Sequence, residues 1–108
     1  MIDKTAIIED GATIEDGVEI GAYAYIGSKV TIKSGTNVMH HATIEGRTTI
    51  GENNTIFPYA SLGTAPQDLK YAGEDTELII GNNNKFREFT LINIGTIQDN
   101  GKTIIGDN

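Results

Sequence analysis

The stretch GTAPQDLKYAGED, residues 63–75, contains four side chains that can bind a polar ligand within only five consecutive positions. Gln67 carries an amide, Asp68 a carboxylate, Lys70 an ammonium group and Tyr71 a phenol, so the stretch offers donors, acceptors and both charges. Binding groups are commonly found on loops that a rigid scaffold holds in place. A polar surface loop that only packs on its neighbours would use the same residue types, so these residues alone leave both readings open.

The two histidines, His40 and His41, are adjacent in the turn that follows Val38. No third metal-ligating residue accompanies the pair, so we predict no metal site. No serine lies in a glycine-flanked nucleophile elbow, and the 108 residues contain no cysteine that could act as a thiolate nucleophile. We expect both histidines to be solvated turn residues, with at most an interface role for His41.

The chain that carries these candidates repeats every six residues. Positions two apart face the same side of a strand, and a small residue such as Ala24 lies two positions before most of the repeated aliphatic residues. A period of six does not keep phase with a helix, and Gly, Asn and Asp between the repeats favour turns. The pattern predicts an all-β chain of short strands and turns. The repeated aliphatic residues are Ile2, Ile8, Ile14, Ile20, Ile26, Ile32, Val38, Ile44, Ile50, Ile56 and Leu62.

The repeat breaks twice, and we expect an external loop at each break. The loops are predicted at about residues 63–78 and 93–103. Leu62 and Ile80 are three hexads apart, so the first break preserves the phase of the repeat. The second break lengthens the aliphatic spacing by one residue. Both stretches are therefore predicted to be loops inserted into one continuous domain that covers residues 1–108.

The composition describes one acidic domain. The formal net charge of −7 and the pI of about 4.6 argue against a nucleic-acid partner, which needs a basic face, and against docking on an anionic membrane. No apolar run approaches the roughly 18 residues of a membrane span, and the first residues do not have the pattern of a signal peptide. We therefore expect a cytoplasmic location.

The six-residue pattern resembles that of the hexapeptide-repeat proteins, whose fold is the left-handed parallel β-helix. In that family three hexads, about 18 residues, form one triangular coil, and stacked coils pair their strands in parallel. The resemblance implies that Ile14, Ile32 and Ile50 form one column and that Ile8, Ile26 and Ile44 form another. It also implies a homotrimer of parallel prisms.

Three stretches resemble bacterial UDP-N-acetylglucosamine O-acyltransferases within that group: IFPYASLGTAPQDLKYAGE, IGNNNKFREF and the later GKTIIGDN. Those enzymes move a 3-hydroxyacyl chain from acyl carrier protein to the sugar 3-hydroxyl of UDP-N-acetylglucosamine, the first step of lipid A biosynthesis, and use no cofactor. The resemblance covers nearly the whole sequence. It implies that residues 1–108 are the N-terminal part of such an enzyme, a prism that is incomplete at its C-terminal end.

Carried over by position, Gln67, Asp68 and Lys70 match family residues that contact the nucleotide sugar at a subunit interface. Lys70 would offset the charge of the diphosphate, Asp68 would accept a hydrogen bond from a hydroxyl, and Gln67 would bond to the sugar. Asn93 stands where some relatives have a histidine that assists the substrate. An amide forms hydrogen bonds but takes up no proton at neutral pH, so the acceptor stays open between the hydroxyl sugar and a 3-amino variant.

The general base of these enzymes is a histidine in a later hexad, within a run like AHD. The sequence reaches Asn108 before any such run. We therefore expect no catalytic residue in residues 1–108, a general base beyond Asn108, and no acyl transfer by this chain alone.

Two other functions remain open for such a prism. One is a non-catalytic scaffold or trimerisation module. The other is a surface-binding protein of the ice-binding kind, which presents flat arrays of hydroxyl groups. Thr13, Thr31 and Thr49 are 18 positions apart and should stack, but the residues two positions after them are not threonine, which interrupts the array.

Overall fold

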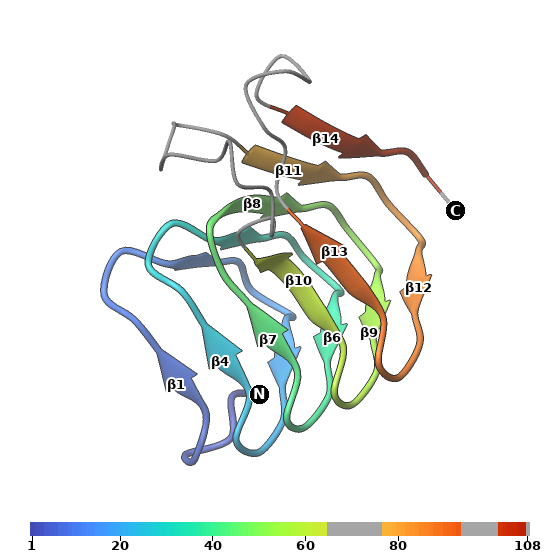
Figure 1. Cartoon of the computed structure of the whole chain (residues 1–108). Helices are drawn as coiled ribbons and strands as arrows, with labels where there is room; N and C mark the ends of the chain where they lie inside the picture. The colour runs from blue at the N-terminus through green and yellow to red at the C-terminus, as the bar shows by residue number, and fades with distance from the viewer. Residues whose placement is uncertain (65–76, 94–101, 108) are drawn as a thin grey trace.

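Short parallel strands wind along the whole chain in the computed structural model, which describes residues 1–64, 77–93 and 102–107 (Figure 1). The strands of these residues form three sheets, and consecutive strands pass from one sheet to the next. Sheet 1 contains β1 (Ile7–Ile8), β4 (Tyr25–Ile26), β7 (Thr43–Ile44), β10 (Ser61–Thr64) and β13 (Leu91–Asn93). Sheet 2 contains β2 (Thr13–Ile14), β5 (Thr31–Ile32), β8 (Arg47–Ile50), β11 (Glu77–Ile80) and β14 (Lys102–Ile105). Sheet 3 contains β3 (Glu19–Ile20), β6 (Asn37–Val38), β9 (Thr55–Ile56) and β12 (Lys85–Phe86). No helix that could cross a membrane occurs in this described part.

Every described strand pairs in parallel with the strand one coil away, as the family resemblance implies. Ile14 is in register with Ile32, and Ile32 with Ile50, so the predicted column is confirmed. Ile8 is likewise in register with Ile26, and Ile26 with Ile44, so the second predicted column is confirmed. Because the side chains of paired residues lie one above the other, a repeated residue type becomes a continuous column through the molecule.

The two loops change the register of the coils. A regular coil takes 18 residues, but Ile50 pairs with Ile80, which lies 30 positions on, so the first loop adds twelve residues. Ile80 pairs with Ile105, which lies 25 positions on, so the second loop adds seven. Ile80 therefore continues the column of Ile50 and not that of Leu62. The hexad count predicted one extra residue at the second break, whereas the structure has seven. The count did not show that each loop replaces a short turn from sheet 1 to sheet 2.

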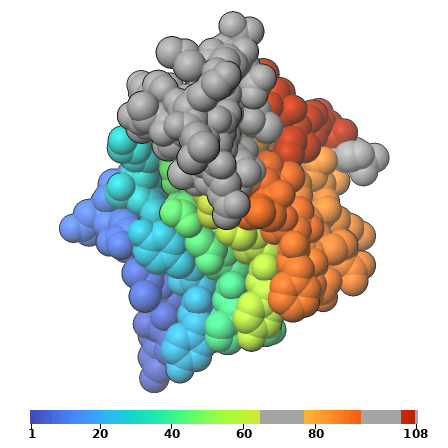
Figure 2. Space-filling model, viewed as in Figure 1, coloured from blue at the N-terminus to red at the C-terminus, as the bar shows by residue number. Residues whose placement is uncertain are grey.

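The core is the inside of the coil. Each repeated aliphatic residue from Ile20 onward, and the small residue two positions before it, points inward and is buried. Figure 2 shows the successive coils as bands that lie against one another along the molecule. The buried apolar residues are Val18, Ile20, Ala24, Ile26, Val30, Ile32, Val38, Ala42, Ile44, Ile50, Ile56, Ala60, Leu62, Leu78, Ile80 and Phe86.

A polar column runs inside the corner between sheets 2 and 3. The Thr36 hydroxyl donates to the Gly51 carbonyl (2.8 Å) and accepts a hydrogen bond from the Asn54 backbone N–H (3.2 Å). The side-chain amide of Asn54 donates to the Gly81 carbonyl (2.8 Å), and its Oδ1 accepts the backbone N–H of Asn84 (2.8 Å). Buried polar groups need such partners, so these residues tie each coil to the next. The asparagine run at residues 82–84 is thus structural, as the sequence indicates.

The threonine column expected from the sequence forms on sheet 2. Thr13 pairs with Thr31 and Thr31 with Thr49. In the next coil the column continues with Ile79, which pairs with Thr49. The hydroxyl array therefore ends after three coils.

Both predicted loops begin and end with strand residues. Strand β10 continues to Thr64 and β11 begins at Glu77, so strand pairing extends two residues into each side of the range 63–78. Strand β13 ends at Asn93, and β14 begins at Lys102. The rest of both loops lies outside the described residues.

Gly63 allows the chain to leave sheet 1. Its φ is +80°, it is buried, and the strand pairing shifts register between Leu62 and Thr64. A Cβ at this position would collide with the carbonyl oxygen of Glu45 and with the Thr48 hydroxyl. A residue with a side chain therefore meets both an unfavourable backbone angle and occupied space.

We predict that Gly63→Ala lowers the free energy of unfolding by about 3 kcal/mol or more, because backbone strain and overpacking act together. Gly17→Ala is the matched control, since Gly17 also has a positive φ (+83°) but has only one atom near its added Cβ, at 3.7 Å. We expect the control to cost about 1–2 kcal/mol, the strain alone. Denaturant unfolding measures both variants. An equal loss of unfolding free energy in Gly63→Ala and Gly17→Ala would contradict the predicted collision of the added Cβ at Gly63.

Candidate functional site

Three of the four predicted substrate-binding residues, Gln67, Asp68 and Lys70, lie outside the described residues, as does Tyr71. The fourth, Asn93, is the last residue of β13, and its backbone is described. The described part of the site is therefore the set of strand ends that hold the two loops.

The two loops leave from one corner of the coil, between sheet 1 and sheet 2. The first loop starts after Thr64 and the second after Asn93, and these two residues are paired neighbours in sheet 1. The loops rejoin sheet 2 at Glu77 and Lys102, which are also paired neighbours. In Figure 1 the ends of β10 and β13 and the beginnings of β11 and β14 lie at this edge. The strand register thus brings Asn93 beside the beginning of the loop that carries Gln67, Asp68 and Lys70.

The coil below the first loop closes this corner tightly. Only Glu45 and Gly46 separate β7 from β8, and Gly46 has a φ of +71°. The Thr48 hydroxyl donates to the Glu45 carbonyl at 2.7 Å and fixes the turn. Because this turn is short and fixed, it forms a rigid base beside the exit of the first loop at Gly63.

Two described groups with shifted pKa values, Asp3 and Tyr25, lie in coils that carry neither loop. The hydroxyl and backbone N–H of Thr5 donate to Asp3 and hold the pKa of its carboxyl below the ordinary value. The phenol of Tyr25 donates to Glu9 at 3.1 Å, and this bond raises the pKa of Tyr25. Within the described ranges, no three His, Cys, Asp or Glu side chains group closely enough to hold a metal ion.

The histidines lie at a different corner from the loops. His40 and His41 are exposed in the turn between sheets 3 and 1, with their Nδ1 atoms 2.9 Å apart. This confirms that they are exposed turn residues. The sequence analysis missed the aromatic neighbours of His41, which are Tyr23 in the preceding coil and Tyr59 in the following one. The spacing of 18 positions on either side of His41 was the available signal.

Comparison with known proteins gives close relatives over the whole chain, although no protein-family model matches it. The acyl-[acyl-carrier-protein]–UDP-N-acetylglucosamine O-acyltransferase of Sulfurovum sp. (strain NBC37-1) is 59% identical over 106 residues, which are 98% of this chain and 41% of that protein. The protein of the same name from Thermodesulfovibrio yellowstonii is 49% identical over 106 residues, with the same coverage of 98% and 41%. The chain thus spans about two-fifths of the length of these curated relatives.

Solved structures agree in fold as well. A crystal structure of a UDP-N-acetylglucosamine acyltransferase superposes on this chain with a TM-score of 0.98 at 51% sequence identity. The superposition covers 100% of this chain and 42% of the acyltransferase chain. The UDP-N-acetylglucosamine acyltransferase from Campylobacter jejuni gives a TM-score of 0.92 at 40% identity, with 98% and 41% covered. These matches confirm the predicted left-handed parallel β-helix. In sequence and in fold, the chain is similar over its whole length to the N-terminal part of UDP-N-acetylglucosamine O-acyltransferases, the resemblance that the QDLKY stretch indicated.

Proposed function

We propose that this chain is the N-terminal part of an acyltransferase that moves a 3-hydroxyacyl chain from acyl carrier protein to the 3-position of UDP-N-acetylglucosamine, the first step of lipid A biosynthesis. The observation that carries the proposal is the similarity over 98% of the chain, at 49–59% identity, to proteins named for this reaction. The pairing of the strand ends that hold both loops supports it, because a substrate site needs its binding groups in one place.

In this proposal residues 1–108 position the nucleotide sugar. Gln67 and Asp68 form hydrogen bonds with the sugar, Lys70 offsets the charge of the diphosphate, and Asn93 presents an amide beside them. The pairing of Thr64 with Asn93 supports this grouping, since it puts the end of β13 next to the start of the first loop.

The chemical step requires a general base beyond Asn108. The base removes the proton of the sugar 3-hydroxyl, and the oxygen attacks the carbonyl carbon of the acyl thioester. Backbone N–H groups stabilise the oxyanion that forms. The C–S bond then breaks, the ester bond remains on the sugar, and the thiol of the carrier protein leaves with a proton.

The proposed enzyme is a homotrimer of parallel prisms that works in the cytoplasm, with acyl carrier protein as its protein partner. The lack of cysteine and the acidic net charge of −7 support a cytoplasmic protein that binds neither nucleic acid nor membrane. Neither the acyl transfer nor the proposed assembly calls for a cofactor or a metal.

An acyl-transfer assay tests the function directly. The full-length gene product that contains this chain should acylate UDP-N-acetylglucosamine, or its 3-amino analogue, when supplied with 3-hydroxyacyl carrier protein. The 108-residue chain assayed alone should give no product, because it lacks the base. Product formation by this chain alone would overturn the proposed mechanism. A full-length product that acylates neither acceptor would overturn the function.

We predict that Lys70→Ala weakens binding of UDP-N-acetylglucosamine to the full-length protein by about tenfold or more, the loss of one charge-assisted contact. Lys85→Ala is the matched control, because Lys85 is an exposed lysine on β12, in the sheet that carries neither loop. Calorimetric titration measures both dissociation constants. Equal affinity of wild type and Lys70→Ala would exclude the proposed role of Lys70.

A further inference from the structure

Both ends of the first loop meet the same short turn, at residues 45–48. The loop leaves sheet 1 at Gly63, where an added Cβ would collide with the Thr48 hydroxyl, so the exit passes directly over this turn. The loop rejoins sheet 2 at Glu77, which is in register with Arg47. One turn therefore borders the chain where the first loop begins and where it ends.

Thr48 is a polar residue at an apolar place of the coil. The equivalent residues of the other coils in sheet 2 are Ala12, Val30 and Leu78, and Thr48 is buried like Val30. A buried hydroxyl costs free energy unless it is hydrogen-bonded, and Thr48 meets this need by donating to the Glu45 carbonyl at 2.7 Å. Because valine fills the same place one coil earlier, the core itself does not require the hydroxyl.

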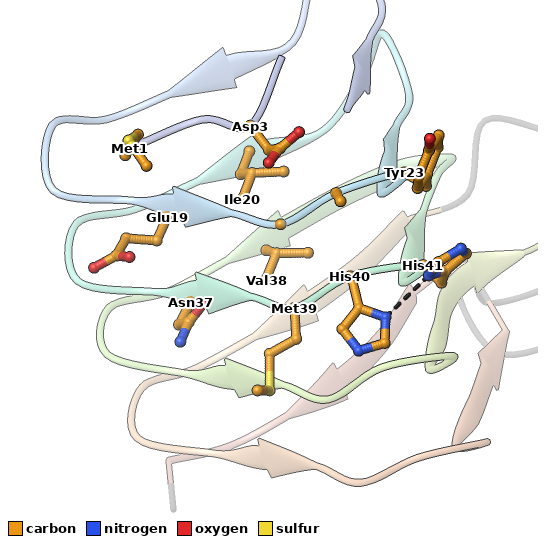
Figure 3. Close-up of a pocket in the computed structure, with 12 residues that line it drawn as sticks. Met1, Asp3, Glu19, Ile20, Tyr23, Asn37, Val38, Met39, His40 and His41 are labelled. Atoms are coloured by element: carbon orange, nitrogen blue, oxygen red, sulfur yellow. Dashed lines mark hydrogen bonds between the residues drawn. The ribbon is translucent and has the colours of Figure 1, made fainter. Parts of the chain in front are cut away.

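Two turns that carry neither loop close with longer backbone hydrogen bonds. The N–H of Val30 donates to the Gly27 carbonyl at 3.3 Å, and the N–H of Ala42 donates to the Met39 carbonyl at 3.4 Å. Figure 3 shows Met39 and His40 along the second of these turns. The hydroxyl bond of 2.7 Å is a shorter closure, and it occurs at the turn that borders the first loop.

Arg47 and Glu77 carry opposite charges on paired strands. They are directly opposite one another in register, and both are half-buried on the outward side of sheet 2. Paired strands lie about 4.8 Å apart, and opposite charges at such positions stabilise the pairing. Lys102, at which the second loop rejoins the sheet, is the next residue in register with Glu77. Residues of alternating charge therefore stand where both loops return.

We propose that Thr48 and Arg47 are positioning residues of the nucleotide-sugar site. The Thr48 hydroxyl fixes the turn over which the first loop leaves, and the Arg47 guanidinium fixes the residue at which that loop returns. Binding groups on a loop are only as well placed as the ends of the loop, so this turn sets how they reach the sugar. The inference rests on the proposed function and adds to it two residues that act through the loop and not through contact with the substrate.

Two substitutions of Thr48 in the full-length gene product separate positioning from packing. T48V keeps the volume and loses the hydroxyl, whereas T48S keeps the hydroxyl and loses a methyl group. T48V should raise the dissociation constant and the KM of UDP-N-acetylglucosamine about fivefold, the loss of one hydrogen bond, with kcat nearly unchanged. T48S should bind like wild type, and so should the control T31V on β5, in a coil that carries neither loop. A residue that only packed would give the reverse order, with T48S the weaker binder.

A double-mutant cycle tests Arg47 by the same calorimetric titration. R47Q and E77Q should each weaken binding of the nucleotide sugar about threefold, and R47Q/E77Q should bind no more weakly than either, because both changes remove one interaction. R47K, which keeps the charge, should bind more tightly than R47Q. K29Q is the matched control, since Lys29 is exposed, lies 18 positions before Arg47 and borders neither loop, and it should bind like wild type.

The outcomes distinguish the positioning role from the function on which it rests. Wild-type affinity in T48V or R47Q, in a protein that still acylates the sugar, would overturn the role of that residue and leave the proposed function standing. Losses as large in the controls T31V and K29Q would overturn it as well. A wild-type protein that neither binds nor acylates UDP-N-acetylglucosamine or its 3-amino analogue would overturn the proposed function itself.

Discussion

Parallel backbone pairing between one coil and the next is the interaction on which the whole molecule depends. The N–H of Tyr25 donates to the carbonyl of Ala42 at 2.9 Å, and the N–H of Thr43 donates to that of Ala60 at the same distance. Each bond sets equivalent residues one above another, so a residue type repeated along the chain becomes a column in space. The aliphatic columns form the core, and because the coil is narrow, most of the residues two positions before them are small.

The three corners of the coil differ from one another in the residues and loops that they carry. Along the faces, pairing and burial restrict the choice of residue, whereas a corner only has to turn the chain. The corner between sheets 2 and 3 uses this freedom for the Thr36, Asn54 and Asn84 column, which satisfies buried polar groups from coil to coil. The corner between sheets 1 and 2 releases both loops, and the corner between sheets 3 and 1 carries His41 and the aromatic rings beside it.

The features that follow the repeat could be predicted from the sequence, and those that interrupt it could not. The register of Ile14, Ile32 and Ile50 follows from the period of six together with the coil of three hexads that the family resemblance implies. The register after each loop did not follow, because a loop of any length can link the same two strand ends. The roles of Gln67, Asp68 and Lys70 came only from the resemblance, since no repeat fixes a side chain on a loop.

The central claim is that the corner where β10 and β13 end holds the nucleotide sugar. A crystal structure of the full-length gene product with UDP-N-acetylglucosamine tests it most directly. We predict that the sugar lies beside Thr64 and Asn93, with the loop residues Asp68 and Lys70 in contact with it. A nucleotide sugar bound away from this corner, for example on the stacked rings of Tyr23 and Tyr59, would contradict the account.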